Sequence, residues 1–339
     1  MYLVTGCAGF IGFHMCEFLL NKGIKVIGID NLNKYYSKDL KLKRLFILKK
    51  KKLFKFFNID LSKKNLDQNL MNNKNLKIIH FAAQPGVIYS YKNPKSYYDN
   101  NILATNNLIL SVKKIKIDQF IFISSSSVYG DQKKYPINEN AKLKSINYYA
   151  ETKIQCEKNI RKKFHKSSHS TKIIRPFTVY GPYGRPDMLI LKMLTLIKKR
   201  KKINIFNHGK HLRDFTYVAD VVKIIYQLSN IKNKDIKTFN ICASNPIEIK
   251  KVVKLFEILL NKKIMVNNLP KRRGEMKITY GSNKHLLKFI NFKKFKPFKD
   301  GLKETINWYK KFKYKKLLEL HKWSQRKLLS FIHYLKEAG

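Results

Sequence analysis

The sequence opens with Tyr2-Leu3-Val4-Thr5-Gly6-Cys7-Ala8-Gly9-Phe10-Ile11-Gly12, in which an apolar segment runs directly into three evenly spaced glycines. Apolar residues at helical spacing follow over 13–20. The order of strand, glycine-rich turn and helix predicts the phosphate-binding unit of a dinucleotide site. Gly6 allows a tight turn, Gly9 lets a diphosphate approach the backbone, and Gly12 lets the helix pack closely on the strand. The free N–H groups of the helix N-terminus then face the phosphates.

A carboxylate follows at the distance that such a site requires. The second expected strand, 25–29, ends in Asp30, 18 residues after Gly12. A carboxylate there can accept hydrogen bonds from both ribose hydroxyls and would repel a 2′-phosphate, which favours NAD over NADP. Taken alone, Asp30 also fits a turn before Asn31. The glycines in register favour cofactor binding.

Further units of strand and helix extend this pattern. The expected strands and the residues that follow them are 54–59 with Asp60, 77–81 with Ala82-Ala83-Gln84, and 119–123 with Ser124-Ser125-Ser126-Ser127. A long helix is expected around 97–112. This alternation predicts an α/β fold, a Rossmann-type doubly wound parallel sheet, whose ligands lie at the carboxyl ends of the strands.

The alternation loosens after residue 175, so we expect two domains. An NAD-binding Rossmann domain would span 1–175, and a smaller mixed α/β substrate-binding domain would span 176–314, with segments that interleave. Residues 315–339 form a basic segment whose apolar residues fit one helical face. We expect this C-terminal extension to pack on the domain or on a partner subunit. Binding to a membrane surface is the alternative.

The charge balance is strongly basic. The 339 residues carry a formal net charge of +49, spread along the whole chain. Among the 71 basic residues, arginines occur only at positions 44, 161, 175, 185, 200, 213, 272, 273 and 326. We interpret the lysine excess as genome composition acting on surface positions, and we expect no nucleic-acid partner; a polyanion-binding protein is the alternative. An arginine that persists in such a chain indicates a position that needs a planar guanidinium.

The remaining composition argues against several other classes. The four cysteines, at positions 7, 16, 156 and 242, lack paired spacing, so neither a metal site nor a disulfide framework is expected. No apolar run approaches the ~20 residues that span a bilayer, and the first residues do not resemble a cleavable leader. We therefore expect no integral membrane segment and a location in the reducing cytoplasm.

Tyr149 and Lys153 lie four residues apart in an expected helix. That spacing places both side chains on one face, about one turn apart. A nearby ammonium stabilises the phenolate and lowers the tyrosine pKa from ~10 toward working pH, which makes a usable base. The pair alone is a weak signal in a chain rich in Lys and Tyr. The NAD site expected upstream supplies the redox cofactor that such a base needs.

The chain also carries an ordered set of longer motifs. They are Asp30-Asn31-Leu32-Asn33 with Tyr35-Tyr36, Ala82-Ala83-Gln84, Ser125-Ser126-Ser127-Val128-Tyr129-Gly130, Phe177-Thr178-Val179-Tyr180-Gly181-Pro182, Gly184-Arg185-Pro186-Asp187-Met188 and Arg213-Asp214-Phe215-Thr216-Tyr217. Together with the glycine turn and Tyr149-x-x-x-Lys153, this set resembles the extended short-chain dehydrogenase/reductases that act on nucleotide sugars. More narrowly, it is similar to UDP-glucuronate 4-epimerases, over residues 1 to about 314.

The resemblance implies an NAD-dependent inversion at C4 of a UDP-sugar. The narrowest implication is conversion of UDP-glucuronate to UDP-galacturonate through a transient 4-keto sugar. Tyr149 as phenolate would remove the 4-hydroxyl proton while the C4 hydride passes to the nicotinamide. Lys153 would lower the tyrosine pKa and hold the nicotinamide ribose. Ser125, with Ser126 as the second choice, would bridge the tyrosine and the sugar oxygen.

The resemblance also implies two sets of binding residues and a homodimer. NAD would be held by Gly6, Gly9, Phe10, Ile11, Gly12, Asp30, Asn31, Asp60, Ala82, Ala83, Gln84, Asn101, Tyr149 and Lys153. The UDP-sugar would be held by Ser126, Ser127, Thr178, Arg185, Arg213, Arg272 and Arg273. Arg213 and one of the last two would clamp the diphosphate, and Arg185 would lie near the sugar carboxylate; Arg175 is expected to serve the scaffold. The dimer would form through the helices around 97–112 and 147–164.

Related reactions stay open as alternatives. A 4-keto glucuronate is a β-keto acid that loses CO2 readily, so an epimerase must hold the carboxylate away from the decarboxylating geometry. Dehydratases and decarboxylases of the superfamily carry an acidic residue before Val-Tyr-Gly, and the serines at 125–127 disfavour both reactions. An epimerase of a neutral or N-acetylated UDP-sugar and a UDP-xylose synthase remain. Gly274-Glu275, in place of Gly-Asp, and Pro85 depart from the pattern of the family.

Overall fold

The computed structural model describes residues 1–63, 66–67, 75–233, 235–271 and 274–312. Within them, a seven-stranded sheet has the order β10-β6-β5-β4-β1-β2-β3, and all neighbouring strands are parallel. Its strands are β1 (Tyr2–Thr5), β2 (Val26–Ile29), β3 (Phe54–Phe57), β4 (Lys77–His80), β5 (Gln119–Ile123), β6 (Ser170–Pro176) and β10 (Lys237–Ile241). The strand order reverses beside β1, which confirms the predicted doubly wound, Rossmann-type sheet.

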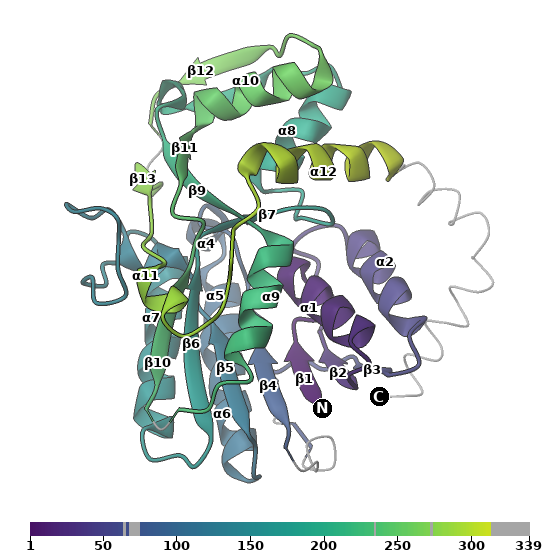
Figure 1. The fold of residues 1–339 in the computed structure, drawn as a ribbon, viewed down its shortest axis with the longest axis vertical. Coiled ribbons are helices and arrows are strands. Elements are labelled where there is room, and N and C mark those ends of the chain that lie inside the picture. The colour runs from purple at the N-terminus through teal and green to yellow at the C-terminus, as the bar shows by residue number, and fades with distance from the viewer. Residues whose placement is uncertain (64–65, 68–74, 234, 272–273, 313–339) are drawn as a thin grey trace.

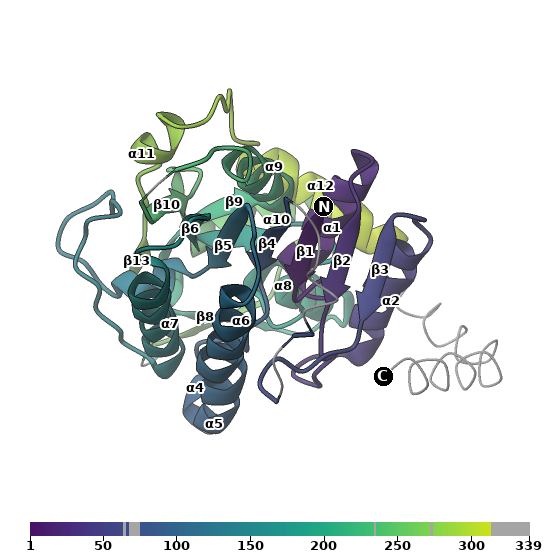
Figure 2. The same ribbon diagram turned by 90° about the horizontal axis from the view of Figure 1, so that it is seen from below.

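Helices cover both faces of this sheet (Figure 1, Figure 2). One face carries α1 (Phe10–Asn21), α2 (Lys38–Lys49) and α9 (Val218–Leu228), and the other carries α6 (Ala104–Lys113) and α7 (Tyr148–Phe164). Three short elements precede α6, namely α4 (Tyr89–Lys92), α5 (Pro94–Tyr97) and the π-helical segment η1 (Tyr98–Leu103). The single regular helix expected around 97–112 is therefore a π-helical segment followed by an α-helix.

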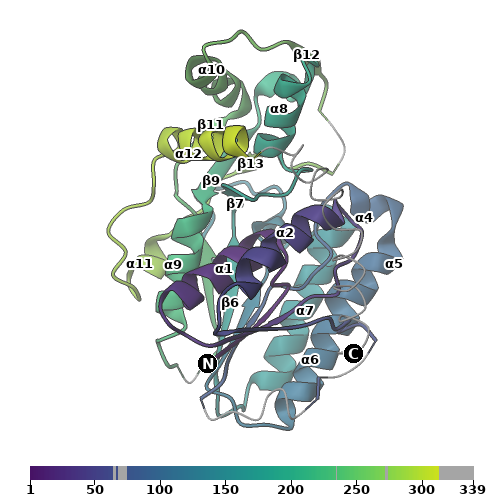
Figure 3. The same cartoon turned by 90° about the vertical axis from the view of Figure 1, so that its right-hand side faces the viewer.

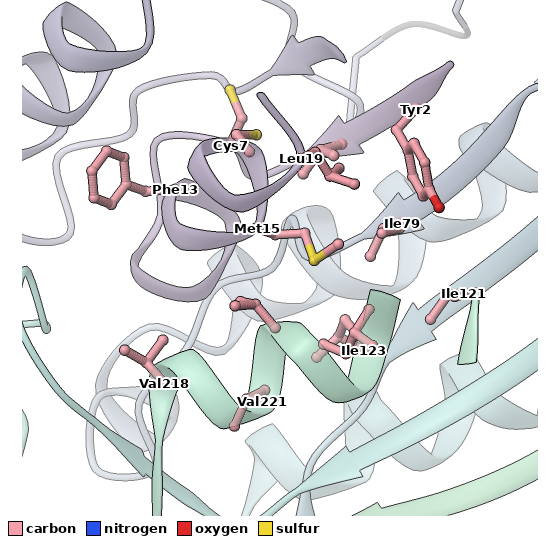
Figure 4. Packing of buried hydrophobic residues seen from close by; sticks show 14 of the residues in the cluster. Tyr2, Cys7, Phe13, Met15, Leu19, Ile79, Ile121, Ile123, Val218 and Val221 are labelled. Atoms are coloured by element: carbon pink, nitrogen blue, oxygen red, sulfur yellow. The ribbon is translucent and has the colours of Figure 1, made fainter. Parts of the chain in front are cut away.

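The two faces of the sheet form two separate hydrophobic clusters. Alternate residues of a strand point to opposite faces, so Val4 packs with α1 and α9 while its neighbour Leu3 packs with α6 and α7. Figure 4 shows the first cluster, to which Met15 of α1, Val221 of α9 and Ile121 of β5 all belong. Each such buried side chain contributes about 1.5–3 kcal/mol. These clusters fix the strand ends, where the loops of the site begin.

A smaller unit lies over the carboxyl ends of the large sheet (Figure 1, Figure 3). In the described residues it holds a four-stranded sheet of β7 (Thr178–Tyr180), β9 (Leu212–Tyr217), β11 (Pro246–Glu248) and β13 (Ile278–Thr279), and a pair of β8 (Ile203–Phe206) and β12 (Val266–Leu269). Its helices are α8 (Leu189–Lys198), α10 (Ile249–Leu260) and α12 (Phe298–Lys311). Short helical turns elsewhere are η2 (Ser126–Tyr129), η3 (Asn207–Gly209) and α11 (Lys284–Leu287). The mixed composition of this unit agrees with the fold class that the sequence predicts.

The chain crosses between the two units more than once. Helix α9 and strand β10 come from beyond residue 176, yet both pack on the large sheet. The division at residues 175 and 176 stays a prediction, with interleaving segments. The expected extension over 315–339 lies outside the described residues. None of the helices in the described part of the chain has the length and apolar character that crossing a membrane requires.

Candidate active site

A cavity of about 440 Å³ lies at the carboxyl ends of the large sheet, and the smaller unit forms its other wall. It brings together most of the residues that the sequence singles out. Lining it are Gly6, Gly9, Phe10, Ile11, Gly12, Asp30, Asn31, Asp60, Ala82, Ala83, Ser125, Ser126, Ser127, Tyr149, Lys153, Thr178, Arg185 and Arg213. Gln84 and Asn101 lie behind the wall, and Arg272 and Arg273 lie outside the described residues.

The glycine turn is shaped to bring a ligand close to the backbone. Gly6 has φ +69°, and a Cβ there would lie 2.7 Å from the backbone nitrogen of Ala82. A Cβ on Gly12 would lie 2.2 Å from the carbonyl oxygen of Gly6. Helix α1 starts after Gly9 without a side-chain cap, so the N–H groups of its first turn stay available to an anion. The cradle fits the diphosphate of a dinucleotide.

Asp30 lies at the end of β2 and is held from three sides. Its Oδ2 accepts from the N–H of Ala8 at 3.1 Å, and its Oδ1 accepts from the N–H of Leu32 at 2.8 Å. The ammonium of Lys41 lies 3.8 Å from Oδ1. Burial lowers the pKa of Lys41, and the charge of Asp30 offsets only part of this effect. Each carboxylate oxygen retains acceptor capacity, which fits the pair of ribose hydroxyls of NAD.

The other expected cofactor residues fall into two groups. Asn31 and Asp60 line the cavity beside Asp30, and Asp60 accepts from the N–H and hydroxyl of Ser62 at 3.0 and 2.7 Å. Gln84 and Asn101 instead support the wall from behind. The side chain of Asn101 accepts from the N–H of Gln84 at 2.7 Å and donates to the Thr152 hydroxyl at 2.9 Å. These bonds hold the loop after β4 against helix α7.

Tyr149 and Lys153 lie on α7 and both face the cavity. Burial raises the pKa of Tyr149, while the Ser125 hydroxyl as hydrogen-bond partner and the charge of Arg185 lower it. Burial lowers the pKa of Lys153 to about 8. The Lys153 ammonium donates to the carbonyl of Ile123 at 2.8 Å. The groups that lower the Tyr149 pKa here are therefore Ser125 and Arg185, and the expected effect of Lys153 stays a prediction.

The serine run turns sharply at the end of β5. Ser125 has an extended backbone, and its Oγ accepts from the N–H of Ser127 at 3.1 Å, which starts η2. The hydroxyl of the neighbouring Ser124 donates to Oε1 of Glu157 at 2.6 Å. Glu157 is paired with Arg175, whose Nε lies 2.9 Å from its Oε1. This buried ion pair, behind the cavity, supports the scaffold role expected for Arg175.

Three of the polar residues on the opposite wall were expected to bind the substrate. Thr178 begins β7, Arg185 lies in the loop after β7, and Arg213 lies on β9. Nε and Nη2 of Arg185 donate to the carboxylate of Asp187 at 3.0 and 2.8 Å. Burial lowers the pKa of Arg213, and Glu275 is the leading opposing charge. The cavity therefore brings the phenol of Tyr149 together with two guanidinium groups.

Comparison with known proteins assigns the chain to a family. The family model described as "NAD dependent epimerase/dehydratase family" matches residues 2–242. The chain belongs to that family. Its cofactor is NAD, which agrees with the prediction from the glycine turn and Asp30 and with the fit of both to a dinucleotide.

Individual members of the epimerase/dehydratase family are similar over nearly the whole chain. The UDP-glucuronate 4-epimerase of Thermodesulfobacterium geofontis is 36% identical over 91% of this chain and 96% of its own. The crystal structure of UDP-glucuronic acid 4-epimerase from Bacillus cereus, in complex with UDP-glucuronic acid and NAD, has a TM-score of 0.86 at 31% identity, covering 91% and 99% of the two chains. The UDP-N-acetylglucosamine 4-epimerase from Methanobrevibacter ruminantium M1 has a TM-score of 0.82 at 27% identity, covering 91% and 98%. The resemblance stated from the motifs is confirmed.

Some residues that line the cavity were not predicted from the sequence. Tyr36, Lys41 and Glu275 line the cavity, but none of the three was among the residues expected to bind a ligand. Lys41 is one of many lysines, so its type carries no signal. Its position does, because it falls on the buried stripe of α2 that also contains Leu40 and Leu45. A charged residue on an apolar stripe is the pattern that could have found it.

Proposed function

We propose that this NAD-dependent UDP-sugar 4-epimerase converts UDP-glucuronate to UDP-galacturonate through a transient 4-keto sugar. The observation that carries the proposal is the placement of Arg185 in the cavity of Tyr149, where its charge acts on the phenol. A guanidinium beside the reacting group is suited to a sugar that carries a carboxylate. The relatives named as UDP-glucuronate 4-epimerases support the same substrate.

The residues at the end of β5 and on α7 would move one proton. Tyr149 takes the proton of the 4-hydroxyl and later returns it, and Ser125 bridges the phenol and the sugar oxygen. Lys153, which lines the cavity next to the tyrosine, holds the nicotinamide ribose and favours the phenolate. When bound, NAD takes up and returns the hydride of the sugar C4. A keto sugar that turns over between these two events is reduced on its other face, which inverts C4.

The opposite wall would hold the two anionic parts of the substrate. Arg213 clamps the diphosphate, and Arg185 holds the carboxylate with hydroxyls of Thr178, Ser126 and Ser127. Bidentate contacts of guanidinium with an anion add orientation to charge. Fixed in this way, the carboxylate is kept out of alignment with the 4-keto group, so CO2 is retained. The serines of the run also supply no carboxylic acid for elimination or decarboxylation.

One observation favours a second candidate, the epimerisation of a neutral or N-acetylated UDP-sugar. The charge of Arg185 is already matched by Asp187, with their side chains 20% and 35% exposed. A matched pair attracts a carboxylate less strongly than a free guanidinium. The similarity to a UDP-N-acetylglucosamine 4-epimerase agrees with this candidate.

A panel of UDP-sugars, followed by NMR without added reductant, separates the two candidates. We expect UDP-glucuronate to be epimerised at least about tenfold more efficiently than UDP-glucose or UDP-N-acetylglucosamine, because a charged hydrogen bond contributes about 1.5–3 kcal/mol. Higher efficiency with a neutral sugar would favour the second candidate. Formation of a UDP-pentose would identify a decarboxylase.

We also propose a homodimer that forms through α6 and α7. Tyr98 and Leu110 are 50% and 46% exposed on the segment η1–α6, which leaves apolar surface on this side. Size-exclusion chromatography with light scattering tests the assembly. A Leu110→Asp variant should shift the mass toward the monomer, and an unchanged mass would place the interface elsewhere.

A further inference from the structure

Three side chains from the unit built on the large sheet, the cofactor half, form hydrogen bonds to the loop 182–187. This loop connects β7 to α8 and carries Arg185. Nε2 of His14, on α1, lies 2.8 Å from the carbonyl oxygen of Pro182. Because a carbonyl oxygen can only accept a hydrogen bond, the imidazole is the donor. The other attachments are made by Arg44 on α2 and by Tyr35 in the segment after β2. All three attaching residues belong to elements that also build the NAD site.

Arg44 joins the glycine turn to this loop. Its side chain is fully buried, and Nη1 donates to the carbonyl of Ala8 at 2.8 Å and to the hydroxyl of Tyr36 at 2.7 Å. Its Nη2 donates to the carbonyls of Tyr183 and Gly184 at 2.5 and 3.3 Å. All four acceptors are neutral oxygens. One planar fork therefore sets the separation between the turn that receives the diphosphate and the backbone that precedes Arg185.

The backbone at Tyr183 needs this support. Its φ is +53°, in the left-handed region that side chains other than glycine rarely adopt. Its ring packs against Phe13 and Trp308, with centroids 5.0 and 4.9 Å apart. Ring packing on one side and the Arg44 hydrogen bond on the other hold this conformation in place.

A second connection reaches Arg185 through its own partner. The hydroxyl of Tyr35 donates to Oδ2 of Asp187 at 3.1 Å, and the same carboxylate receives Nε and Nη2 of Arg185. The plane of the guanidinium is therefore set by a carboxylate that the cofactor half anchors. Tyr35 lies three residues beyond Leu32, whose N–H binds Asp30.

We propose that Arg44 is a positioning residue, which, together with the Tyr35–Asp187 hydrogen bond, aligns Arg185 with the sugar carboxylate relative to the bound NAD. The inference rests on the proposed function, because it needs Arg185 to face a carboxylate. Arg44 itself is not among the residues that line the cavity. Its effect is therefore on selectivity for the carboxylate rather than on binding of the nucleotide.

The substitution Arg44→Lys tests this role, because it keeps the charge and removes the fork. The measurement is the affinity of the NAD-loaded enzyme for UDP-glucuronate and for UDP. We expect Arg44→Lys to weaken UDP-glucuronate binding about tenfold relative to UDP, since misplaced anion contacts lose bidentate geometry. Affinity for UDP and the content of bound NAD should stay unchanged.

Tyr35→Phe provides a second variant that keeps the ring and removes only the hydrogen bond to Asp187. It should lower the same affinity ratio about threefold or more, which corresponds to the net contribution of a typical hydrogen bond. Two controls separate selectivity from stability. Arg161→Lys changes an arginine at an exposed site, and Leu228→Ala destabilises the core under α9 away from the cavity. Neither should change the ratio.

Arg185→Ala distinguishes failure of the inference from failure of the proposed function. If Arg185→Ala lowers the ratio while Arg44→Lys and Tyr35→Phe leave it unchanged, the positioning role is wrong and the carboxylate site stands. If Arg185→Ala also leaves the ratio unchanged, Arg185 does not bind the sugar carboxylate, and both the proposed function and the inference are contradicted. If Arg44→Lys does not fold, the ratio measured with Tyr35→Phe decides.

Discussion

The ammonium of Lys153 donates a 2.8 Å hydrogen bond to the carbonyl of Ile123, which ties helix α7 to the end of strand β5. Tyr149 lies one helical turn before Lys153, and Ser125 follows Ile123 by two residues. The bond therefore holds the helix that carries the phenol against the strand end that carries the serine. The scaffold thus positions Tyr149 and Ser125, the base and the bridging hydroxyl of the proposed reaction, so substitutions at either are expected to act on chemistry more than on folding.

Replacing Tyr149 by Phe removes the hydroxyl that moves the proton and keeps the ring, which contacts Tyr97 with centroids 6.1 Å apart. We expect kcat to fall about 10²–10⁴-fold, the usual contribution of a general base, while bound NAD is retained. Steady-state kinetics and the absorbance of released cofactor measure both. Tyr148→Phe, at the neighbouring position, is the control. A variant that keeps more than about a tenth of the parent rate would place the base elsewhere.

Replacing Ser125 by Ala should move the pH dependence of catalysis. Burial raises the pKa of Tyr149, and Ser125 is the leading group that lowers it. Without that hydrogen bond the pKa rises, less phenolate forms at a given pH, and the acid limb of kcat shifts to higher pH. Ser126→Ala should leave the limb in place. A shift only in Ser126→Ala would make Ser126 the bridging residue.

Replacing Asp30 by Asn should weaken cofactor binding and selectivity. The neutral amide loses acceptor strength toward the ribose hydroxyls and the repulsion of a 2′-phosphate. We expect the affinity for NAD to fall about tenfold, which corresponds to a loss of about 1.4 kcal/mol of binding free energy. The preference for NAD over NADP should become smaller. Fluorescence titration measures both affinities, with Asp39→Asn, at an exposed position of α2, as control. An unchanged preference would mean that Asp30 serves only the turn.

Replacing Gly12 by Ala should disrupt the glycine turn. The new Cβ would lie 2.2 Å from the carbonyl oxygen of Gly6, and backbone atoms cannot yield as a flexible side chain does. We expect the free energy of unfolding to fall by at least about 3 kcal/mol and bound NAD to be lost. Gly23→Ala is the matched control, because no atom lies within 4 Å of its Cβ and only its φ of +71° is strained. It should cost about 1 kcal/mol. Equal losses would show that the turn tolerates a side chain.

The cofactor half was predictable because its signals are local. The glycine turn, Asp30 and the serine run each follow a strand directly, and the parallel sheet brings strand ends to one edge. The spacing of Tyr149 and Lys153 depends only on helix geometry. The groups that act on the pKa of Tyr149 could not be predicted from that spacing. In the structure Lys153 donates to the carbonyl of Ile123, while Ser125 and Arg185 lower the pKa of the phenol.

The attachments between the two halves were not predictable from the sequence. The bonds of Arg44 join segments as far apart as Ala8 and Gly184, and no spacing rule links such positions. The pairing of Arg185 with Asp187 is local, but the motif suggested only its contact with substrate. The packing of α9 and β10 on the large sheet was likewise not predictable, since the apolar pattern of both elements fits either unit.

The most direct test of the proposed reaction follows UDP-glucuronate deuterated at C4 in ordinary water by NMR. Hydrogen removed from C4 and returned to the same carbon is not exchanged with solvent, because the bound cofactor carries it throughout. We therefore predict UDP-galacturonate that retains deuterium at C4, with no pentose product. Loss of the label to solvent, a UDP-pentose, or no inversion at C4 would contradict the account.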